Sequence, residues 1–175
     1  MEARTSGSLV SRAIGAAMLD VNVYEEVEAD RSATTQAATV VLAVAVANVI
    51  GSWGAGGAGI AGGVIAAFLG WLLWAGVTNI VGTRLLGGTA DWGELLRTLG
   101  FAQAPGVLAV LGILPILGGL VGFGVAIWTL VAGIIAIRQA LDFGTGKAVI
   151  TALISMVIVV IASMAIGTVL GVGVG

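Results

Sequence analysis

Three long stretches without a charged side chain constrain what this sequence can fold into. They cover residues 32–83, residues 98–137 and residues 148–175, and all three are rich in alanine, valine, leucine, isoleucine and glycine. A helix needs about 20 mostly apolar residues to cross the hydrocarbon core of a bilayer. The first two stretches are each long enough for two helices and the third for one. The sequence therefore predicts an all-α, polytopic membrane protein with five transmembrane helices.

Composition agrees with a membrane protein and removes several classes of function. Hydrophobic residues make up 59% of the chain and charged residues 9%, whereas a soluble domain has about 25% charged residues. The chain has no cysteine and no histidine, so it has no thiol nucleophile and lacks the commonest general base and zinc ligand. The net charge of -2 does not indicate a nucleic-acid partner. We expect neither an enzyme nor a cofactor. The ratio of arginine to lysine fits a GC-rich bacterial genome.

Glycine and proline divide the two longer charge-free stretches. Residues 51–59 are too rich in glycine to continue a helix at low cost, and residues 114–119 combine a proline with two glycines. The third of the resulting spans is the shortest, so a hairpin that enters the membrane and returns is an alternative to a full crossing. The predicted spans run from Thr35 to Ile50, Ile60 to Leu85, Pro105 to Leu117, Leu120 to Leu141 and Lys147 to Val169.

The distribution of charge predicts an orientation. If five helices cross, the N-terminal segment and the loops 84–97 and 138–147 share one side, and every lysine and arginine lies on that side. The positive-inside rule places this side in the cytoplasm. We therefore expect a multi-pass protein of the cell (inner or plasma) membrane, with a cytoplasmic N-terminus and the C-terminus outside.

The chain divides into a cytoplasmic N-terminal segment, residues 1–34, and a membrane domain, residues 35–175. Apolar residues recur at helical spacing from Leu9 to Val21, which predicts an amphipathic helix lying in the membrane interface. It leads through the acidic stretch Tyr24–Asp30 into the first span. The segment lacks the short apolar core of a secretory signal.

A second interfacial helix is predicted over residues 91–100. Asp91 is followed three residues later by Glu94, a spacing that resembles a capping box. The neighbouring Trp92 is a residue type that favours the headgroup region.

Glycine spacing gives two further patterns. Residues 54–59 match the dinucleotide-binding pattern G-x-G-x-x-G, but no strand precedes them, so the match is a coincidence of glycine content. Glycine pairs four residues apart favour close helix packing within one bundle, with a dimer or partner interface as the alternative. These pairs are Gly59 and Gly63, Gly118 and Gly122, and Gly167 and Gly171.

The charged residues outside the spans are the candidate functional residues. The acidic cluster Glu25, Glu26, Glu28 and Asp30 lacks the ligand spacing of a calcium loop, so a solvated face or a docking surface for a basic partner is favoured over a cation site. A lipid-headgroup site built from the cations of the two loops is a further hypothesis, and the alternative is that these charges only set topology. Residues of the two loops that can converge into one polar cluster are Arg84, Asp91, Glu94, Arg97, Arg138, Gln139, Asp142 and Lys147. The candidate site for a partner or lipid comprises Glu25, Glu28, Arg84, Arg97, Arg138, Asp142 and Lys147.

The predicted spans contain no ionisable residue except at their edges. Proton and ion relays usually need ionisable side chains at depth. The main polar side chains in the spans are Asn48, Thr78, Asn79 and Thr129, too few to indicate a coupled transporter.

Three stretches of the chain resemble the Yip family, the Ypt/Rab-interacting membrane proteins, and its bacterial relatives. They are residues 19–30 (LDVNVYEEVEAD), residues 95–105 (LLRTLGFAQAP) and residues 137–147 (IRQALDFGTGK). The resemblance implies five membrane helices and a cytoplasmic N-terminus. Eukaryotic members bind prenylated small GTPases in vesicle traffic through a long cytoplasmic N-terminal domain. This chain lacks that domain, which argues against GTPase binding. The third stretch is similar to a segment of the bacterial relatives, so the resemblance implies a bacterial-type member.

These observations predict a non-enzymatic membrane scaffold or partner-binding protein that recognises a protein or lipid headgroups at the cytoplasmic face. The partner would be a membrane or cytoplasmic protein, or a second copy of the chain. One alternative is a small-solute transporter or channel with a wet cavity near Asn48, Thr78 and Asn79. Another alternative is an accessory subunit of a larger membrane complex.

Overall fold

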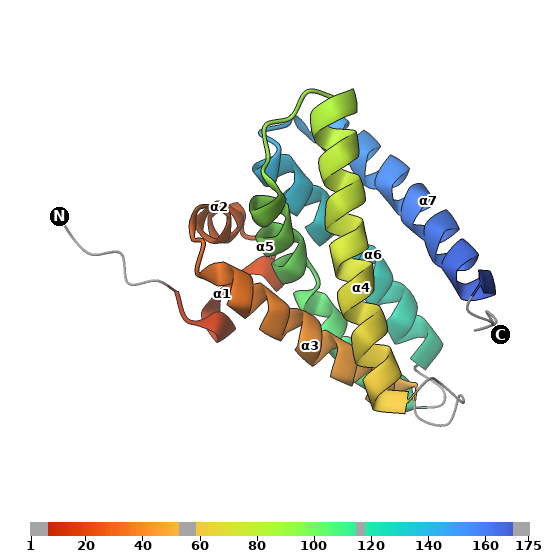
Figure 1. Ribbon diagram of the computed structural model, residues 1–175. Helices are drawn as coiled ribbons and strands as arrows, with labels where there is room; N and C mark the ends of the chain where they lie inside the picture. The colour runs from red at the N-terminus through yellow and green to blue at the C-terminus, as the bar shows by residue number, and fades with distance from the viewer. Residues whose placement is uncertain (1–6, 53–58, 115–117, 170–175) are drawn as a thin grey trace.

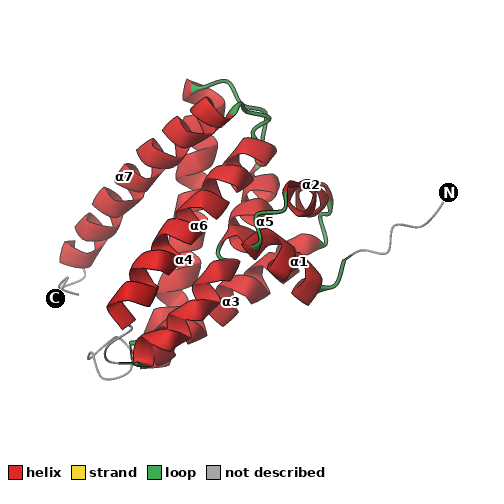
Figure 2. Cartoon of the chain, turned by 180° about the vertical axis from the view of Figure 1, so that it is seen from behind, coloured by secondary structure: helices red, strands yellow, loops and turns green. Residues whose placement is uncertain are grey.

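The computed structural model describes residues 7–52, 59–114 and 118–169, and these residues form helices joined by short loops (Figures 1 and 2). Two short helices, α1 (Leu9–Ala17) and α2 (Val21–Ala29), pack beside a bundle of longer helices. Within the described residues, five helical elements are long and apolar enough to cross a membrane. The prediction of an all-α polytopic membrane protein with five spans is confirmed. The five elements are α3 (Ala33–Gly51), α4 (Gly59–Asn79) extended by the π-helix η1 (Ile80–Leu85), α5 (Trp92–Ala102) extended by the 3-10 helix η2 (Ala104–Ile113), α6 (Gly118–Ala140) and α7 (Thr145–Val169).

The third span differs from its prediction. The capping box is present, because Asp91 accepts a hydrogen bond of 2.8 Å from the Glu94 backbone N–H and Glu94 accepts one of 2.7 Å from the Asp91 N–H. The helix that it starts is buried from Leu95 to Ala102 and forms the first half of the span 92–113. Both the interfacial placement of residues 91–100 and a span beginning at Pro105 are therefore wrong.

Proline explains the error at the third span. Pro105 lies in the first turn of η2, where its missing N–H removes no helical hydrogen bond. The chain tightens from an α-helix to a 3-10 helix at this point and continues in the same element. The predicted end at Leu117 lies outside the described residues.

Small residues let α3 and the third span approach closely. A Cβ atom added to Gly100 would lie 2.7 Å from Ala37 Cβ, and one added to Gly106 would lie 2.7 Å from Val44 Cγ1. Further along, a Cβ on Gly51 would collide with the backbone carbonyl of Ala109. Backbones at this separation gain van der Waals contact, which drives helix association where no water is present to be expelled.

Among the described members of the glycine pairs, Gly63 and Gly118 are packed closely inside the bundle, whereas Gly59 and Gly122 are not. Gly63 faces Val49 of α3, with an added Cβ only 2.6 Å from Val49 Cγ2, and Gly118 faces the backbone of Gly112. Gly122 has no atom near an added Cβ. Gly171 and most of the G-x-G-x-x-G pattern (residues 54–58) lie outside the described residues.

The N-terminal segment folds as two helices where one amphipathic helix and an acidic connection were predicted. Leu19 adopts a φ of 65° and breaks the helix, and the Asp20 side chain then caps α2 by accepting from the Asn22 N–H at 3.0 Å. The acidic stretch is therefore helical, and its Tyr24 and Val27 are fully buried. Tyr24 ties the two helices together, since its hydroxyl donates to the Ala16 carbonyl at 3.0 Å.

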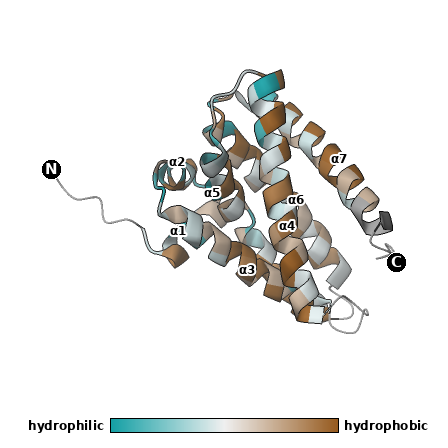
Figure 3. Cartoon of the chain, viewed as in Figure 1, coloured by the Kyte–Doolittle hydropathy of each residue, from teal (hydrophilic) through white to brown (hydrophobic). Residues whose placement is uncertain are grey.

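Hydrophilic residues gather around α2, the start of α5 and the end of the second span, whereas the rest of the bundle is predominantly hydrophobic (Figure 3). We refer to this region as the charged end of the bundle. The α6–α7 connection joins it, because Lys147 at the start of α7 donates to the Leu86 carbonyl at 3.0 Å.

Candidate functional site

The charged end brings together side chains from α2, the loop before α5, and the α6–α7 connection. Gln139 Nε2 donates to Glu25 Oε1 at 2.9 Å, which joins α6 to α2. Thr89 Oγ1 donates to Asp142 Oδ2 at 2.8 Å, which joins the loop to the end of α6. The Thr89–Asp142 contact brings the two loops together, as predicted for them, and the Gln139–Glu25 contact adds the acidic stretch, which that prediction did not include. A partner or lipid site at these residues stays a prediction.

Glu28 occupies the most unusual electrostatic position in the cluster. The pKa of its carboxyl is raised to about 7, mainly by burial and then by the nearby carboxylates of Glu94 and Asp142, with a smaller contribution from Glu25. The charge of Arg97 opposes this shift without cancelling it. We call Glu25, Glu28, Glu94 and Asp142 the acidic patch, because each adds negative charge to the same region.

Arg97 has a structural position inside the bundle. Only 5% of the residue is exposed, and its Nε donates to the carbonyl oxygens of Val27 and Glu28, both at 3.0 Å. Its Nη2 also donates to the Glu28 carbonyl. These are free carbonyls at the C-terminal end of α2, where a cation is favourable for the helix dipole.

The other predicted cations have separate surroundings. Lys147 donates to the Leu86 carbonyl and lies 5.2 Å from the centre of the Phe143 ring. Arg138 Nε donates to Gln139 Oε1 at 3.0 Å. Arg84 is exposed and makes no side-chain hydrogen bond or ion pair within the described residues. Of the candidate residues, the structure therefore assembles the acidic ones, while the cations mostly hold backbone or neighbouring amide groups.

Two members of the predicted acidic cluster are used internally, by an arginine that the sequence interpretation did not assign a role. Arg12 is 2% exposed, and its Nη2 lies 2.8 Å from Glu26 Oε1 and 2.7 Å from Asp30 Oδ2. Its Nη1 donates to Gln36 Oε1 at 3.0 Å. We call this set of contacts the Arg12 clasp. The sequence feature that could have indicated this role is the position of Arg12 within an otherwise apolar helical pattern.

The clasp shifts the pKa values of its carboxyls. The pKa of Glu26 is lowered by the Gly7 backbone N–H and then by Arg12, and the pKa of Asp30 is lowered by Ser32 and then by Arg12. The pKa of Arg12 is raised, because the two carboxylates outweigh its burial.

Among the described residues, no group of three acidic side chains has the geometry of a metal site.

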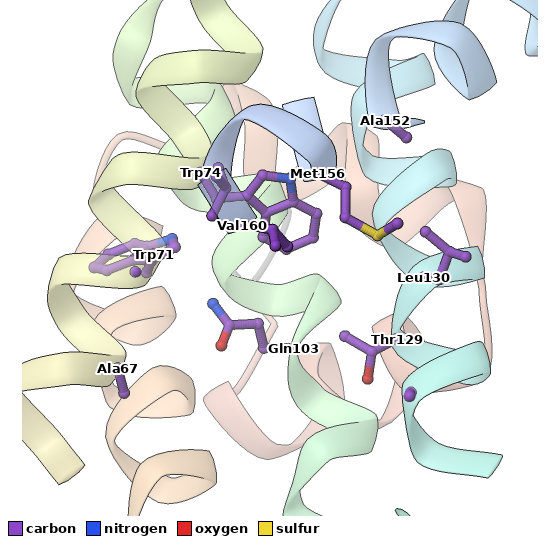
Figure 4. Close-up of a pocket in the computed structure, with 12 residues that line it drawn as sticks. Ala67, Trp71, Trp74, Gln103, Thr129, Leu130, Ala152, Met156 and Val160 are labelled. Atoms are coloured by element: carbon purple, nitrogen blue, oxygen red, sulfur yellow. The ribbon is translucent and has the colours of Figure 1, made fainter. Parts of the chain in front are cut away.

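A cavity of about 370 Å³ lies between α4, α6, α7 and the junction of α5 with η2 (Figure 4). A second cavity of about 360 Å³ lies between α3, η2 and α6. Gln103, Ala126 and Thr129 line both cavities.

The residues that line the two cavities can be compared with the polar residues that the sequence analysis named in the spans. Asn48 lines the second cavity and Thr129 lines both. Thr78 is buried elsewhere, and the Asn79 amide donates to the Ala90 carbonyl at 3.2 Å. Gln103 was missed, although it is the one amide side chain in the charge-free stretch 98–137.

A groove of about 520 Å³ runs between α1, α3, η2 and α6, and its lining is almost wholly apolar. Trp128 of α6 lines the groove, and its Nε1 donates to the Ala17 carbonyl at 2.7 Å. Val10 and Ile14 of this lining are exposed at 65% and 55%, and Met18, just after the end of α1, is exposed at 75%. We call these three residues the α1 stripe.

Comparison with protein families matches residues 22–167 to the Yip1 domain. The chain belongs to the Yip1 domain family. No curated protein and no solved structure matches it. The matched region contains the second and third of the stretches that resemble the family, residues 95–105 and 137–147, and most of the first.

Membership of the Yip family describes the chain as a multi-pass membrane protein of a family not known for enzymatic activity. The acidic patch and both cavities lie within the matched residues, whereas α1 precedes them. The acidic patch and the two cavities are therefore features of the Yip domain itself.

Proposed function

We propose that this Yip-family protein is a non-enzymatic membrane scaffold whose acidic patch binds a basic segment of a partner protein. The observation that supports this is the setting of Glu28, which is surrounded by three further carboxylates and by one buried arginine. Negative charge gathered in this way attracts a cationic segment and accelerates its association.

Protein recognition is favoured over binding of anionic lipid headgroups. An anionic headgroup would be repelled by the acidic patch, and two of the four cations proposed for such a site, Arg97 and Lys147, donate to backbone carbonyls. A lysine- or arginine-rich segment, in contrast, would relieve the mutual repulsion of Glu28, Glu94 and Asp142.

The proposal includes an orientation and a membrane. We place the charged end in the cytoplasm of a bacterial-type host, because all lysines and arginines lie in the N-terminal segment or in the parts of the spans nearest to that end. The N-terminus is then cytoplasmic and the C-terminus outside. Labelling of single cysteines from either side of the cell membrane tests this, since the native chain has no cysteine. Thr145→Cys should react from the cytoplasm and Ser52→Cys from outside, and the reverse result would invert the orientation.

The partner interaction can be tested by site-specific photo-crosslinking in native membranes. A photo-reactive residue is introduced at Gly144, an exposed position next to Asp142. The expected result is a protein adduct whose yield drops several-fold when Glu25 and Asp142 are changed to Gln and Asn. Asp20→Asn is the matched control, because asparagine also caps a helix and Asp20 lies outside the acidic patch.

Two outcomes would reject this proposal. One is an adduct whose yield is insensitive to the two substitutions and to added salt, and the other is an adduct with lipid alone. A stoichiometric adduct with one membrane protein would identify the chain as an accessory subunit of a larger complex, with the acidic patch as its contact.

A further inference from the structure

The cavity at the junction of α5 and η2, which opens to the surface of the bundle, has the chemistry of a ligand site. We propose that it binds a neutral amphiphile taken from the bilayer, a molecule with a long apolar chain and one uncharged oxygen group such as a hydroxyl or ketone. In this assignment Gln103 and Thr129 hydrogen-bond the oxygen group, and the surrounding rings and aliphatic side chains hold the chain.

The first argument is that two polar side chains at this position lack partners. Neither the Gln103 amide nor the Thr129 hydroxyl makes a hydrogen bond to any residue that the structure describes. Both line the same two cavities, and Figure 4 shows Gln103 between Trp71 and Thr129 in the space below Trp74 and Met156. Polar groups without partners are costly away from water, and a ligand with one oxygen group would satisfy them.

The second argument concerns charge. No acidic or basic side chain lines either cavity, so a charged ligand would lie uncompensated in a medium of low dielectric constant. The Trp71 indole N–H is already used, since it donates to the Leu96 carbonyl at 3.1 Å. The ring of Trp71 therefore contributes apolar surface, as Trp74 and Met156 do.

The third argument concerns access. Met156 and Val160 of α7 line the first cavity and are exposed at 44% and 51% on the apolar surface of the bundle. The cavity therefore reaches the surface that faces lipid in a protein of this class. Its volume of about 370 Å³ falls within the range of roughly 300–1,000 Å³ that is typical of small-molecule sites.

The fourth argument concerns depth. Gln103 lies one residue beyond the end of α5, which begins at Trp92 near the charged end. At 1.5 Å per residue this places Gln103 about 9 Å beyond Arg97, the residue that holds α2 at the charged end. Gln103 is therefore separated from the charged side chains by more than one helical turn, and an uncharged polar group is the one expected to meet it.

Tryptophan fluorescence of the full chain in lipid nanodiscs provides the test. The probe is ω-bromododecanol, whose bromine quenches nearby indoles, and bromododecane is the matched probe without the hydroxyl. The expected result is a saturable quenching phase with the alcohol and only linear, unsaturable quenching with the bromoalkane. Because Trp71 and Trp74 line the cavity, a bound probe lies within reach of both rings.

Three variants assign the quenching phase to the cavity. Gln103→Leu and Thr129→Val each remove a polar partner with little change in volume, and each should weaken binding of the alcohol at least fivefold. Ala126→Leu fills the space shared by both cavities and should abolish the saturable phase. Gly124→Leu is the control on the same helix, because an added Cβ there meets no atom and Gly124 lines neither cavity.

Thermal unfolding of each variant in the same nanodiscs separates a lost site from a lost fold. If Gln103→Leu fails to fold, Thr129→Val and Ala126→Leu still test whether the saturable phase comes from the cavity. Thr129 and Ala126 lie on the regular helix α6, where we expect these substitutions to leave the backbone unchanged. Saturable quenching that persists in both of these variants would overturn the proposal. Linear quenching by the alcohol in the unsubstituted chain would overturn it as well.

Discussion

Arg97 Nε lies 3.0 Å from the carbonyl oxygen of Val27, so a charge inside the third membrane helix holds the C-terminal end of the second N-terminal helix. The two residues are 70 positions apart in sequence. Through this contact the orientation of α2, and with it the positions of Glu25 and Glu28, depends on a residue within the membrane bundle.

Arg97→Lys should loosen α2 although it preserves the charge. A lysine ammonium cannot reproduce the forked donor geometry that reaches the Val27 and Glu28 carbonyls together. We expect the free energy of local opening of α2 to fall by about 1–3 kcal/mol, seen as faster amide hydrogen exchange over residues 21–29. Arg84→Lys is the control, and equal exchange in both variants would contradict a role for Arg97 in holding α2.

Stability near the acidic patch should decrease as pH rises. The pKa of Glu28 is about 7 in the folded protein, above the value of about 4.3 for an unfolded chain. The folded state therefore binds the proton more tightly, and the stabilisation from protonated Glu28 is present below about pH 4.3 and is lost as pH rises through 7.

Glu28→Gln should remove this dependence. We expect the variant to unfold a few degrees higher than the unsubstituted protein at pH 8 and at nearly the same temperature at pH 5. Thermal unfolding in nanodiscs at the two pH values measures the difference. Glu25→Gln is the comparison, and identical pH profiles for the unsubstituted protein and Glu28→Gln would show that Glu28 does not titrate in this range.

Arg12→Met should release α1 from the bundle. Methionine keeps most of the apolar volume but leaves Glu26, Asp30 and Gln36 without their shared donor. Because the two carboxylates are partly exposed, we expect a loss of about 1–2 kcal/mol, less than for a fully buried pair. Limited proteolysis near Leu19 reports it. The control is Arg31→Met, since Arg31 is exposed.

Gly100→Ala and Gly124→Ala should differ in effect although both are helical glycines. A Cβ on Gly100 would lie 2.7 Å from Ala37 Cβ, whereas one on Gly124 meets nothing. We expect Gly100→Ala to cost about 1–3 kcal/mol through overpacking of α3 against α5, and Gly124→Ala to be neutral or slightly stabilising. Unfolding in a graded series of denaturing detergent distinguishes them.

The sequence predicted most of the membrane architecture because hydrophobic length is a strong physical signal. The first, second, fourth and fifth spans begin and end within two residues of their predicted limits wherever the structure describes those limits. The third span was placed too late because Glu94 and Arg97 were taken as marks of an aqueous loop. A charged residue can lie within a span when a neighbouring helix supplies its partners, and a single sequence does not show which helices are neighbours.

The candidate site was predicted in part for the same reason. Glu25 and Asp142 lie near enough to Glu28 to raise its pKa, since short loops and helix ends meet at one end of a bundle, but their role as a binding site stays a prediction. The Arg12 clasp and the cavity at Gln103 depend on contacts between distant segments. Periodicity identifies the face of a helix but not the residue opposite it.

The Arg12 clasp and the Arg97 contact together make a continuous mechanical connection. Arg12 fixes α1 to α2, and Arg97 fixes α2 to the third span, while Trp128 holds the far end of α1 against α6. The α1 stripe is thereby mounted on the same rigid frame as the acidic patch. A force on the stripe therefore acts on the whole bundle, because α1 is held at fixed contacts and cannot move independently of the other helices.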